Sequence, residues 1–119
     1  MAPGSEMRGS ARADVSNAIV QICRECYGRG PTKAKTYLFD NYVFVVTEDL
    51  LTTVEETLVN NGHQDKVREF RLIFQEAVAD RFKGAVEEAV GRRVVAYHSQ
   101  VVFDPPMGFE IFVLDGPAT

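Results

Sequence analysis

The sequence predicts an α+β fold with two layers: a four-stranded antiparallel sheet built from two β-hairpins, with the helices on one face. Three observations support it. Two long segments, 11–27 and 64–90, repeat apolar residues at helical spacing. Each is followed by two short β-rich segments with turn residues between them. A third, shorter helix is expected from its capping sequence. The predicted order is therefore α-β-β-α-α-β-β, and 119 residues suffice for one hydrophobic core.

The chain divides into one domain and two short ends. Residues 1–10 are rich in glycine, serine and proline and show no apolar periodicity, so we expect a flexible N-terminal lead. Residues 11–115 then form a single domain, and 116–119 form a short tail.

The first half of the domain is a helix followed by a hairpin. In 11–27 the apolar positions recur three and four residues apart: Val15, Ile19, Ile22 and Cys26. Gly28 is expected to end this helix, since glycine readily takes the left-handed conformation of a C-terminal cap. Segments 33–39 and 42–47 alternate or are β-branched and aromatic, with an Asp-Asn pair between them. They predict the first hairpin.

The middle of the chain is helical. Thr52 is followed three residues later by Glu55, which is the spacing of a capping box, and predicts a short helix ending near Asn60. The long apolar pattern of 64–90 covers roughly seven helical turns. Gly91 is expected to end it.

A second hairpin completes the domain. We expect strands at 94–103 and 109–114, with a turn over 104–108. Each long helix ends in Gly-Arg just before its hairpin, which suggests an internal αββ repeat. Two hairpins joined edge to edge leave two free sheet edges. Pairing across such an edge is a common route to symmetric dimers, so we predict a homodimer.

Composition argues against several functional classes. The net charge of −4 and a sequence pI of about 5.1 do not favour nucleic-acid binding, which needs clustered basic surface. Cys23 and Cys26 share a helical face, as redox or metal pairs can. They lie near a helix C-terminus, however, where the dipole disfavours a thiolate, so we expect reduced structural cysteines. His63 and His98 have no evident partner. We therefore expect no metal, no cofactor and no catalytic activity.

Basic residues are the remaining candidates for a site. Arg29, Lys33 and Arg92 lie just after helix ends, where cations complement the dipole; the alternative is an anion or acidic-partner site. Arg71 and Arg81 fall within the apolar stripe of the long helix. A buried guanidinium must be paired, so Arg71 is expected to meet a carboxylate or backbone carbonyls. An oligomer interface or an anion pocket is the alternative. The candidate binding residues are Arg29, Lys33, Arg71 and Arg92.

Several of these residues also form a pattern typical of one family. The pattern consists of Gly28-Arg29-Gly30-Pro31-Thr32-Lys33-Ala34, Leu51-Thr52 with Glu55 and Leu58, Gly62, and Val67 through Arg71 to Phe74. From about Asp14 to Leu114 the chain resembles the bacterial and archaeal MpsC domain, the third component of a Na⁺-translocating, membrane-potential-generating system. The resemblance implies an accessory cytoplasmic protein that acts by binding to a membrane system for cation or inorganic-carbon transport.

Two functions remain open. The first is a non-catalytic interaction or regulatory module that docks on a membrane transport complex. No stretch approaches the roughly 18 apolar residues of a membrane span, so we expect no direct insertion and a cytoplasmic location. The second is a homodimeric domain that binds a small anion. A pocket on which several of the basic groups converge would favour the second function, and a flat surface would favour the first.

Overall fold

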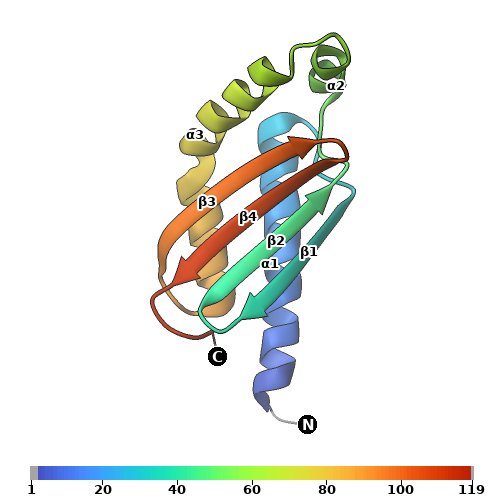
Figure 1. Cartoon of the computed structure of the whole chain (residues 1–119). Coiled ribbons are helices and arrows are strands. Elements are labelled where there is room, and N and C mark those ends of the chain that lie inside the picture. Colours follow the sequence, from blue (N-terminus) through green and yellow to red (C-terminus); the bar gives the residue numbers. More distant parts are fainter. Residues whose placement is uncertain (1–2, 119) are drawn as a thin grey trace.

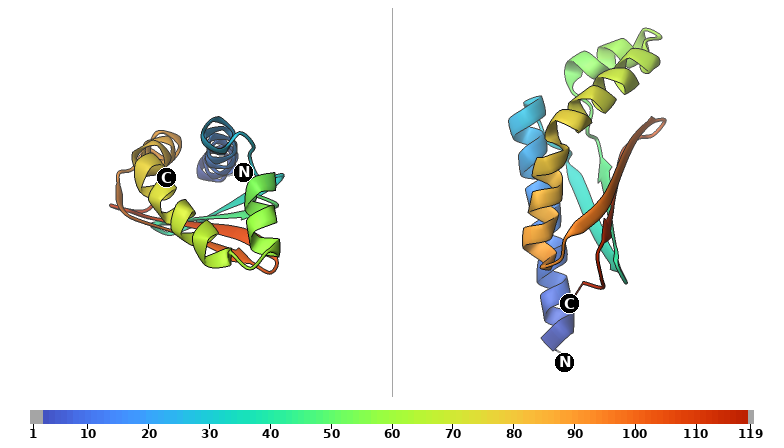
Figure 2. Two further views of the ribbon diagram at one scale, coloured as in Figure 1. Left: turned by 90° about the horizontal axis from the view of Figure 1, so that it is seen from above. Right: turned by 90° about the vertical axis from the view of Figure 1, so that its left-hand side faces the viewer.

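The computed structural model describes residues 3–118 and confirms the α+β fold. Four antiparallel strands form one open sheet in the order β1-β2-β4-β3 (Figure 1). The long helices lie on a single side of this sheet (Figure 2). The elements are α1 Pro3–Tyr27, β1 Lys33–Phe39, β2 Tyr42–Glu48, α2 Thr53–Asn60, α3 Gln64–Val90, β3 Val94–Phe103 and β4 Pro106–Leu114.

Two boundaries differ from expectation. Helix α1 begins at Pro3, so residues 3–10, expected as a flexible lead, are helical, while residues 1–2 lie outside the described part. Proline is tolerated in the first helical turn because its missing N–H would have no partner there. Strand β4 begins at Pro106, which leaves a two-residue turn in place of the expected 104–108. A proline is acceptable as the first residue of a strand.

The two hairpins meet through their second strands. β2 pairs with β4 from Tyr42 opposite Val113 to Glu48 opposite Met107, which confirms the edge-to-edge joining. β1 and β3 are consequently the two edges of the sheet. Each long helix precedes a hairpin whose second strand is central, an arrangement consistent with an αββ repeat. Helix α2 is an addition to that repeat.

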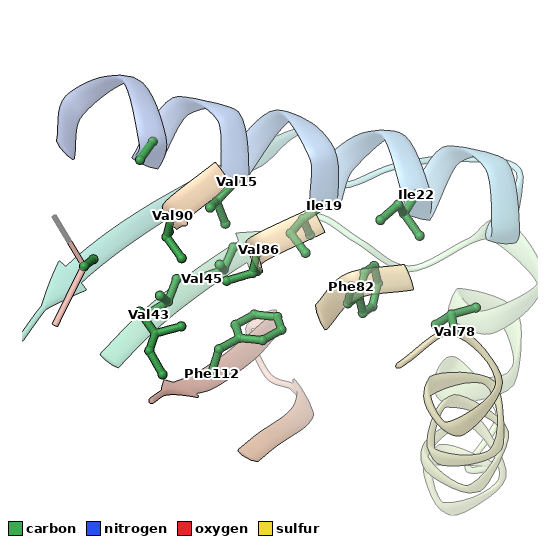
Figure 3. Close-up of a cluster of buried hydrophobic side chains, with 13 residues drawn as sticks. Val15, Ile19, Ile22, Val43, Val45, Val78, Phe82, Val86, Val90 and Phe112 are labelled. Carbon is green, nitrogen blue, oxygen red and sulfur yellow. The ribbon is translucent and has the colours of Figure 1, made fainter. Parts of the chain in front are cut away.

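The main core lies between the sheet and the two long helices (Figure 3). Val15 of α1, Val86 of α3 and Phe112 of β4 are fully buried there. Each such side chain contributes on the order of 1.5–3 kcal/mol by leaving water. The helical apolar spacing seen in the sequence therefore corresponds to the faces that cover the sheet.

A second, smaller cluster supports the end of the molecule near α2. Leu50, Leu51, Val67, Val101 and Phe103 pack there, beneath the N-terminal half of α3. This half of α3 is bent relative to the half that runs beside α1, and it carries α2 with it (Figure 2). The fold is elongated, with extents of 51 × 25 × 23 Å. Within residues 3–118, none of the helices has the length and apolar composition that crossing a membrane requires.

Gly108 appeared in the sequence as a turn residue, but it lies inside β4 for a packing reason. A Cβ at this position would lie 2.5 Å from Oγ1 of Thr47 and 3.0 Å from a methyl carbon of Leu50. Gly84, within α3, has open space around the same position.

We expect opposite effects from the same substitution at these two glycines. Gly108→Ala should lower the free energy of unfolding by about 1–3 kcal/mol, because Thr47 and Leu50 must shift. Gly84→Ala should raise it by about 0.5–1 kcal/mol, since alanine restricts the unfolded chain and favours a helix. Urea unfolding followed by circular dichroism measures both. An unchanged midpoint for Gly108→Ala would contradict the tight contact.

Candidate functional site

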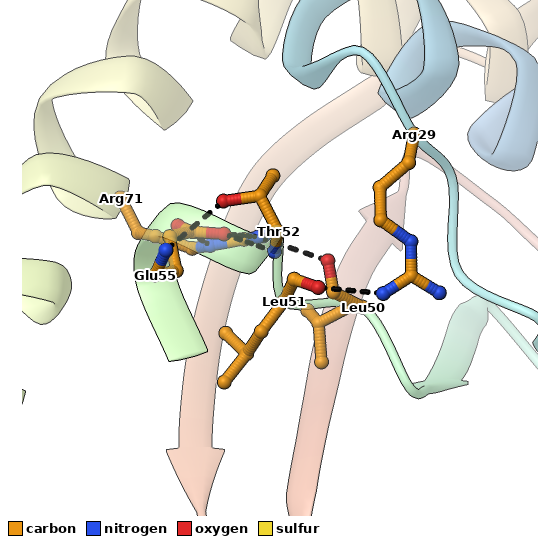
Figure 4. A network of polar contacts seen from close by, with 6 residues as sticks. All are labelled: Arg29, Leu50, Leu51, Thr52, Glu55 and Arg71. Carbon is orange, nitrogen blue, oxygen red and sulfur yellow. Dashed lines mark hydrogen bonds and ion pairs between the residues drawn. The ribbon is translucent and has the colours of Figure 1, made fainter. Parts of the chain in front are cut away.

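Arg71 is at the centre of a polar network that joins α2 to α3 (Figure 4). Its Nε donates to Oε2 of Glu55 at 2.7 Å, and its Nη2 donates to Oε1 of Glu55 at 2.6 Å. Nη2 also donates to the carbonyl of Leu50 at 3.1 Å. The guanidinium lies 4.3 Å from the ring centroid of Tyr27. Arg71 thus meets both a carboxylate and a backbone carbonyl, as expected for a buried guanidinium.

Glu55 is shared between this ion pair and the predicted capping box. Its Oε1 accepts from the backbone N–H of Thr52 at 2.9 Å, and its own N–H donates to Oγ1 of Thr52 at 3.1 Å. Burial raises the pKa of Glu55, but the hydrogen bonds from Arg71 and Thr52 outweigh burial and lower that pKa below its usual range. The carboxylate therefore stays charged and holds both partners.

The four candidate basic residues do not converge on one pocket. Arg29 donates to the carbonyl of Leu51 at 2.6 Å and pairs with Asp49 at 3.2 Å. Arg29 and Arg71 therefore hold consecutive carbonyls of the connection before α2 (Figure 4). Lys33 lies on the edge strand β1, and Arg92 lies after α3. Their partners are acidic residues of the neighbouring segments: Glu48 for Lys33 at 3.6 Å, and Asp115 for Arg92 at 4.0 Å.

The expectation that Arg81 is in the buried stripe was wrong. Its side chain is about half exposed and pairs with Glu25 of α1 at 2.8 Å. Arg81 lies one residue before the buried Phe82, and so roughly 100° from it around the helix axis. This rotation directs it along the flank of α3, toward α1.

A buried acid that the sequence analysis did not single out lies on β4. Glu110 is 8% exposed, accepts from the Tyr97 hydroxyl at Oε1 at 2.7 Å, and accepts from the Ser99 hydroxyl at Oε2. Burial raises the pKa of Glu110 to about 7, although both hydroxyls act to lower it. The strand pattern held the signal, because Glu110 alternates in phase with the core residue Phe112.

Glu110 faces a cavity of about 330 Å³ between α3, α1 and the sheet. Its apolar lining includes Ile19, Leu50, Leu72, Phe82 and Val101, and its polar lining includes Cys23, Tyr27, Arg68, Arg71, Ser99 and Glu110. Burial raises the pKa of Cys23 to about 12, so this thiol remains protonated and unreactive at neutral pH. Of the four candidate residues, Arg71 is the one that lines this cavity.

The other face of the sheet is not covered by any element of residues 3–118 (Figure 2). We call it the open face, and define it by Tyr37, Phe39, Tyr42, Phe44, Val46, Phe109, Ile111 and Val113. These side chains align in cross-strand rows. One row runs from Tyr37 through Phe44 to Ile111, and the next from Phe39 through Tyr42 to Val113. Contiguous exposed apolar surface of this kind marks an interaction site.

We expect the buried ion pair to dominate stability at the α2 end. Arg71→Ala should lower the free energy of unfolding by about 3–5 kcal/mol, since it leaves the Glu55 carboxylate buried without its cationic partner. Arg81→Ala removes an exposed ion pair of similar length and should have a much smaller effect. Chemical denaturation at neutral pH compares the two. Equal losses would contradict the burial of the Glu55–Arg71 pair.

Glu110 should make stability depend on pH. Because the pKa of Glu110 rises from 4.5 to about 7 on folding, the folded chain binds more protons in this range, and stability falls as pH rises through it. Glu110→Gln lacks this dependence. Relative to that of the original chain, the free energy of unfolding of this variant should rise by about 2–4 kcal/mol between about pH 5 and pH 8. Urea unfolding at several pH values measures the difference, and parallel pH profiles would rule it out.

Comparison with known proteins gives one match, to a protein family. The family model described as "Na+-translocating membrane potential-generating system (MpsC)" matches residues 7–116. Neither the curated proteins nor the solved structures give a match to this chain. The family match covers every strand, both α2 and α3, and most of α1. The chain therefore belongs to the MpsC family.

Proposed function

We propose that this protein is a non-catalytic accessory module of a Na⁺-translocating, membrane-potential-generating system, and that it docks on a protein partner of that system through the open face. The family match supports the association with such a system. The observation that carries the docking proposal is the row of aromatic side chains on a sheet face that no described helix covers.

The open face has the size of an interaction patch. The stretch over which β2 pairs with β1 and with β4 is seven residues long, or roughly 23 Å, and the three strands together are roughly 14 Å wide. Their projected area is about 300 Å², before the relief of the side chains is counted, and so reaches the range of large functional patches. Phe39 is 69% exposed and Tyr37 is 45% exposed, so much of their apolar surface would leave water on docking.

The rim of the open face indicates the chemistry of the partner. Lys33 and Lys35 project from β1 on the same side as Tyr37 and Phe39. The Nζ of Lys35 lies 5.2 Å from the ring centroid of Tyr37. A partner surface with an apolar centre and acidic residues around it would complement this arrangement. Lys33, one of the four candidate binding residues, would contact the partner at this rim.

The second function, a small-anion site built from all four candidate residues, finds less support. Arg29, Lys33 and Arg92 each have an acidic partner nearby and lie in different parts of the fold. The homodimer remains a prediction, with the β1 and β3 edges available for pairing. A cytoplasmic location is likewise part of the proposal.

Affinity purification tests the docking proposal. The tagged chain is expressed in its native cell, the membranes are solubilised in detergent, and co-purified membrane proteins are identified by mass spectrometry. Phe39→Ser should reduce the recovered membrane complex at least tenfold, because it removes the most exposed aromatic ring of the open face. Ile73→Ser is the matched control, since Ile73 is also 69% exposed but lies on α3.

The comparison between the two variants decides where docking takes place. Loss of the complex with Ile73→Ser and not with Phe39→Ser would contradict docking through the open face. It would indicate a docking surface on α3, near the α2 end. Full recovery with both variants would contradict docking through the open face. Recovery of no membrane protein by the original chain would count against the accessory role itself.

A further inference from the structure

Docking through the open face gives no role to the cavity on the opposite, helix-covered side of the sheet. We propose that this cavity binds a small amphipathic monoanion: an organic acid with one carboxylate and a compact apolar body. The inference goes beyond the docking function and depends on different residues, those of α1, α3 and the covered face of the sheet.

The size and walls of the cavity suit such a molecule. Its volume, about 330 Å³, is at the lower end of the range for small-molecule pockets. Ile19 projects into it from α1, Leu50 from the connection before α2, and Phe82 from α3. Apolar walls with a few polar groups are typical of pockets that bind partly apolar ligands.

The positive charge comes from two arginines on α3. Arg68 and Arg71 both line the cavity and lie three residues apart, and hence on the same side of the helix. Arg71 is neutralised by Glu55, but its Nη1 has no hydrogen-bond partner among the described residues. Arg68 packs over the Phe103 ring at 5.1 Å and has no carboxylate at ion-pair distance within residues 3–118. The arginine side therefore has one excess positive charge and unused N–H donors.

Glu110 provides the opposite wall and makes the charge balance depend on its proton. In its neutral form it adds no negative charge to the cavity and leaves the excess charge of Arg68 in place. The groups that face it are Tyr97 and Ser99 of β3, Arg71 of α3, and Cys23 and Tyr27 of α1. When Glu110 loses its proton, the cavity has no net charge and disfavours an anion.

Three six-carbon probes of similar shape test the ligand class: hexanoate, 1-hexanol and hexylamine. Each is titrated into the full chain at about pH 6 and followed by protein-observed NMR. We expect saturable binding of hexanoate at least tenfold tighter than that of either other probe, with shifts at residues of the cavity. Hexanoate is ionised at both about pH 6 and about pH 8. Its affinity should fall several-fold between them, as Glu110 loses its proton.

Two variants at exposed positions keep the fold intact and separate the cavity from other surfaces. Arg68→Gln removes the excess charge and should weaken hexanoate binding at least fivefold, whereas Arg93→Gln, an equal charge change at an exposed position after α3, should not. Leu72→Trp adds bulk to a half-exposed residue of the lining and should also weaken binding. Phe39→Ser alters the open face alone and should leave binding unchanged.

Several results would overturn the proposal. One is the absence of saturable hexanoate binding. Another is binding of hexylamine or 1-hexanol as tight as that of hexanoate. A third is hexanoate affinity unchanged in both Arg68→Gln and Leu72→Trp. Since none of these readouts involves the membrane system, failure here would leave the docking proposal standing, and failure of docking would leave this one standing.

Discussion

The bidentate ion pair between Glu55 and Arg71 holds together the part of the fold that the main core does not reach. Its two residues come from α2 and α3, and Arg71 also holds the carbonyl of Leu50 and the ring of Tyr27 at the end of α1. Four segments therefore meet at one guanidinium. A planar group with a fixed fork of donors suits this position better than a lysine would, because carboxylate and carbonyl are bound at once. These contacts anchor the bent N-terminal half of α3 to α2 and to the end of α1.

The arrangement of the helices leaves two surfaces of interest, one on each side of the sheet. The cavity above Glu110 lies under the N-terminal half of α3, whose Arg68, Arg71 and Leu72 line it. On the other side of the sheet, no helix among residues 3–118 covers β1, β2 and β4. One layer of helices on one sheet buries one sheet face. The aromatic residues of the open face therefore remain in contact with water unless another molecule covers them.

The sequence predicted the elements well, because each had a local signal. The capping box of Thr52 and Glu55, and the glycine after each long helix, marked helix ends correctly. Features that depend on contacts between distant segments were harder to predict. Gly108 looked like part of a turn. It is required for another reason: a side chain there would collide with Thr47 and Leu50, which lie on other segments. Arg81 shows a related limit: it lies at the edge of the apolar stripe, and its ion pair with Glu25 depends on where α1 lies in space.

Glu110 links the two faces of the sheet through β4. Its neighbours Phe109 and Ile111 point to the open face, while its own carboxyl points to the cavity. An apolar residue at this position would avoid the desolvation that a carboxyl suffers. Tyr97 and Ser99 satisfy both oxygens, but burial still raises the pKa of Glu110 to about 7, so the acid disfavours the folded state above that pH. Glu110 therefore destabilises the folded state although both of its oxygens are hydrogen-bonded. A role for its proton in the cavity explains this better than packing alone.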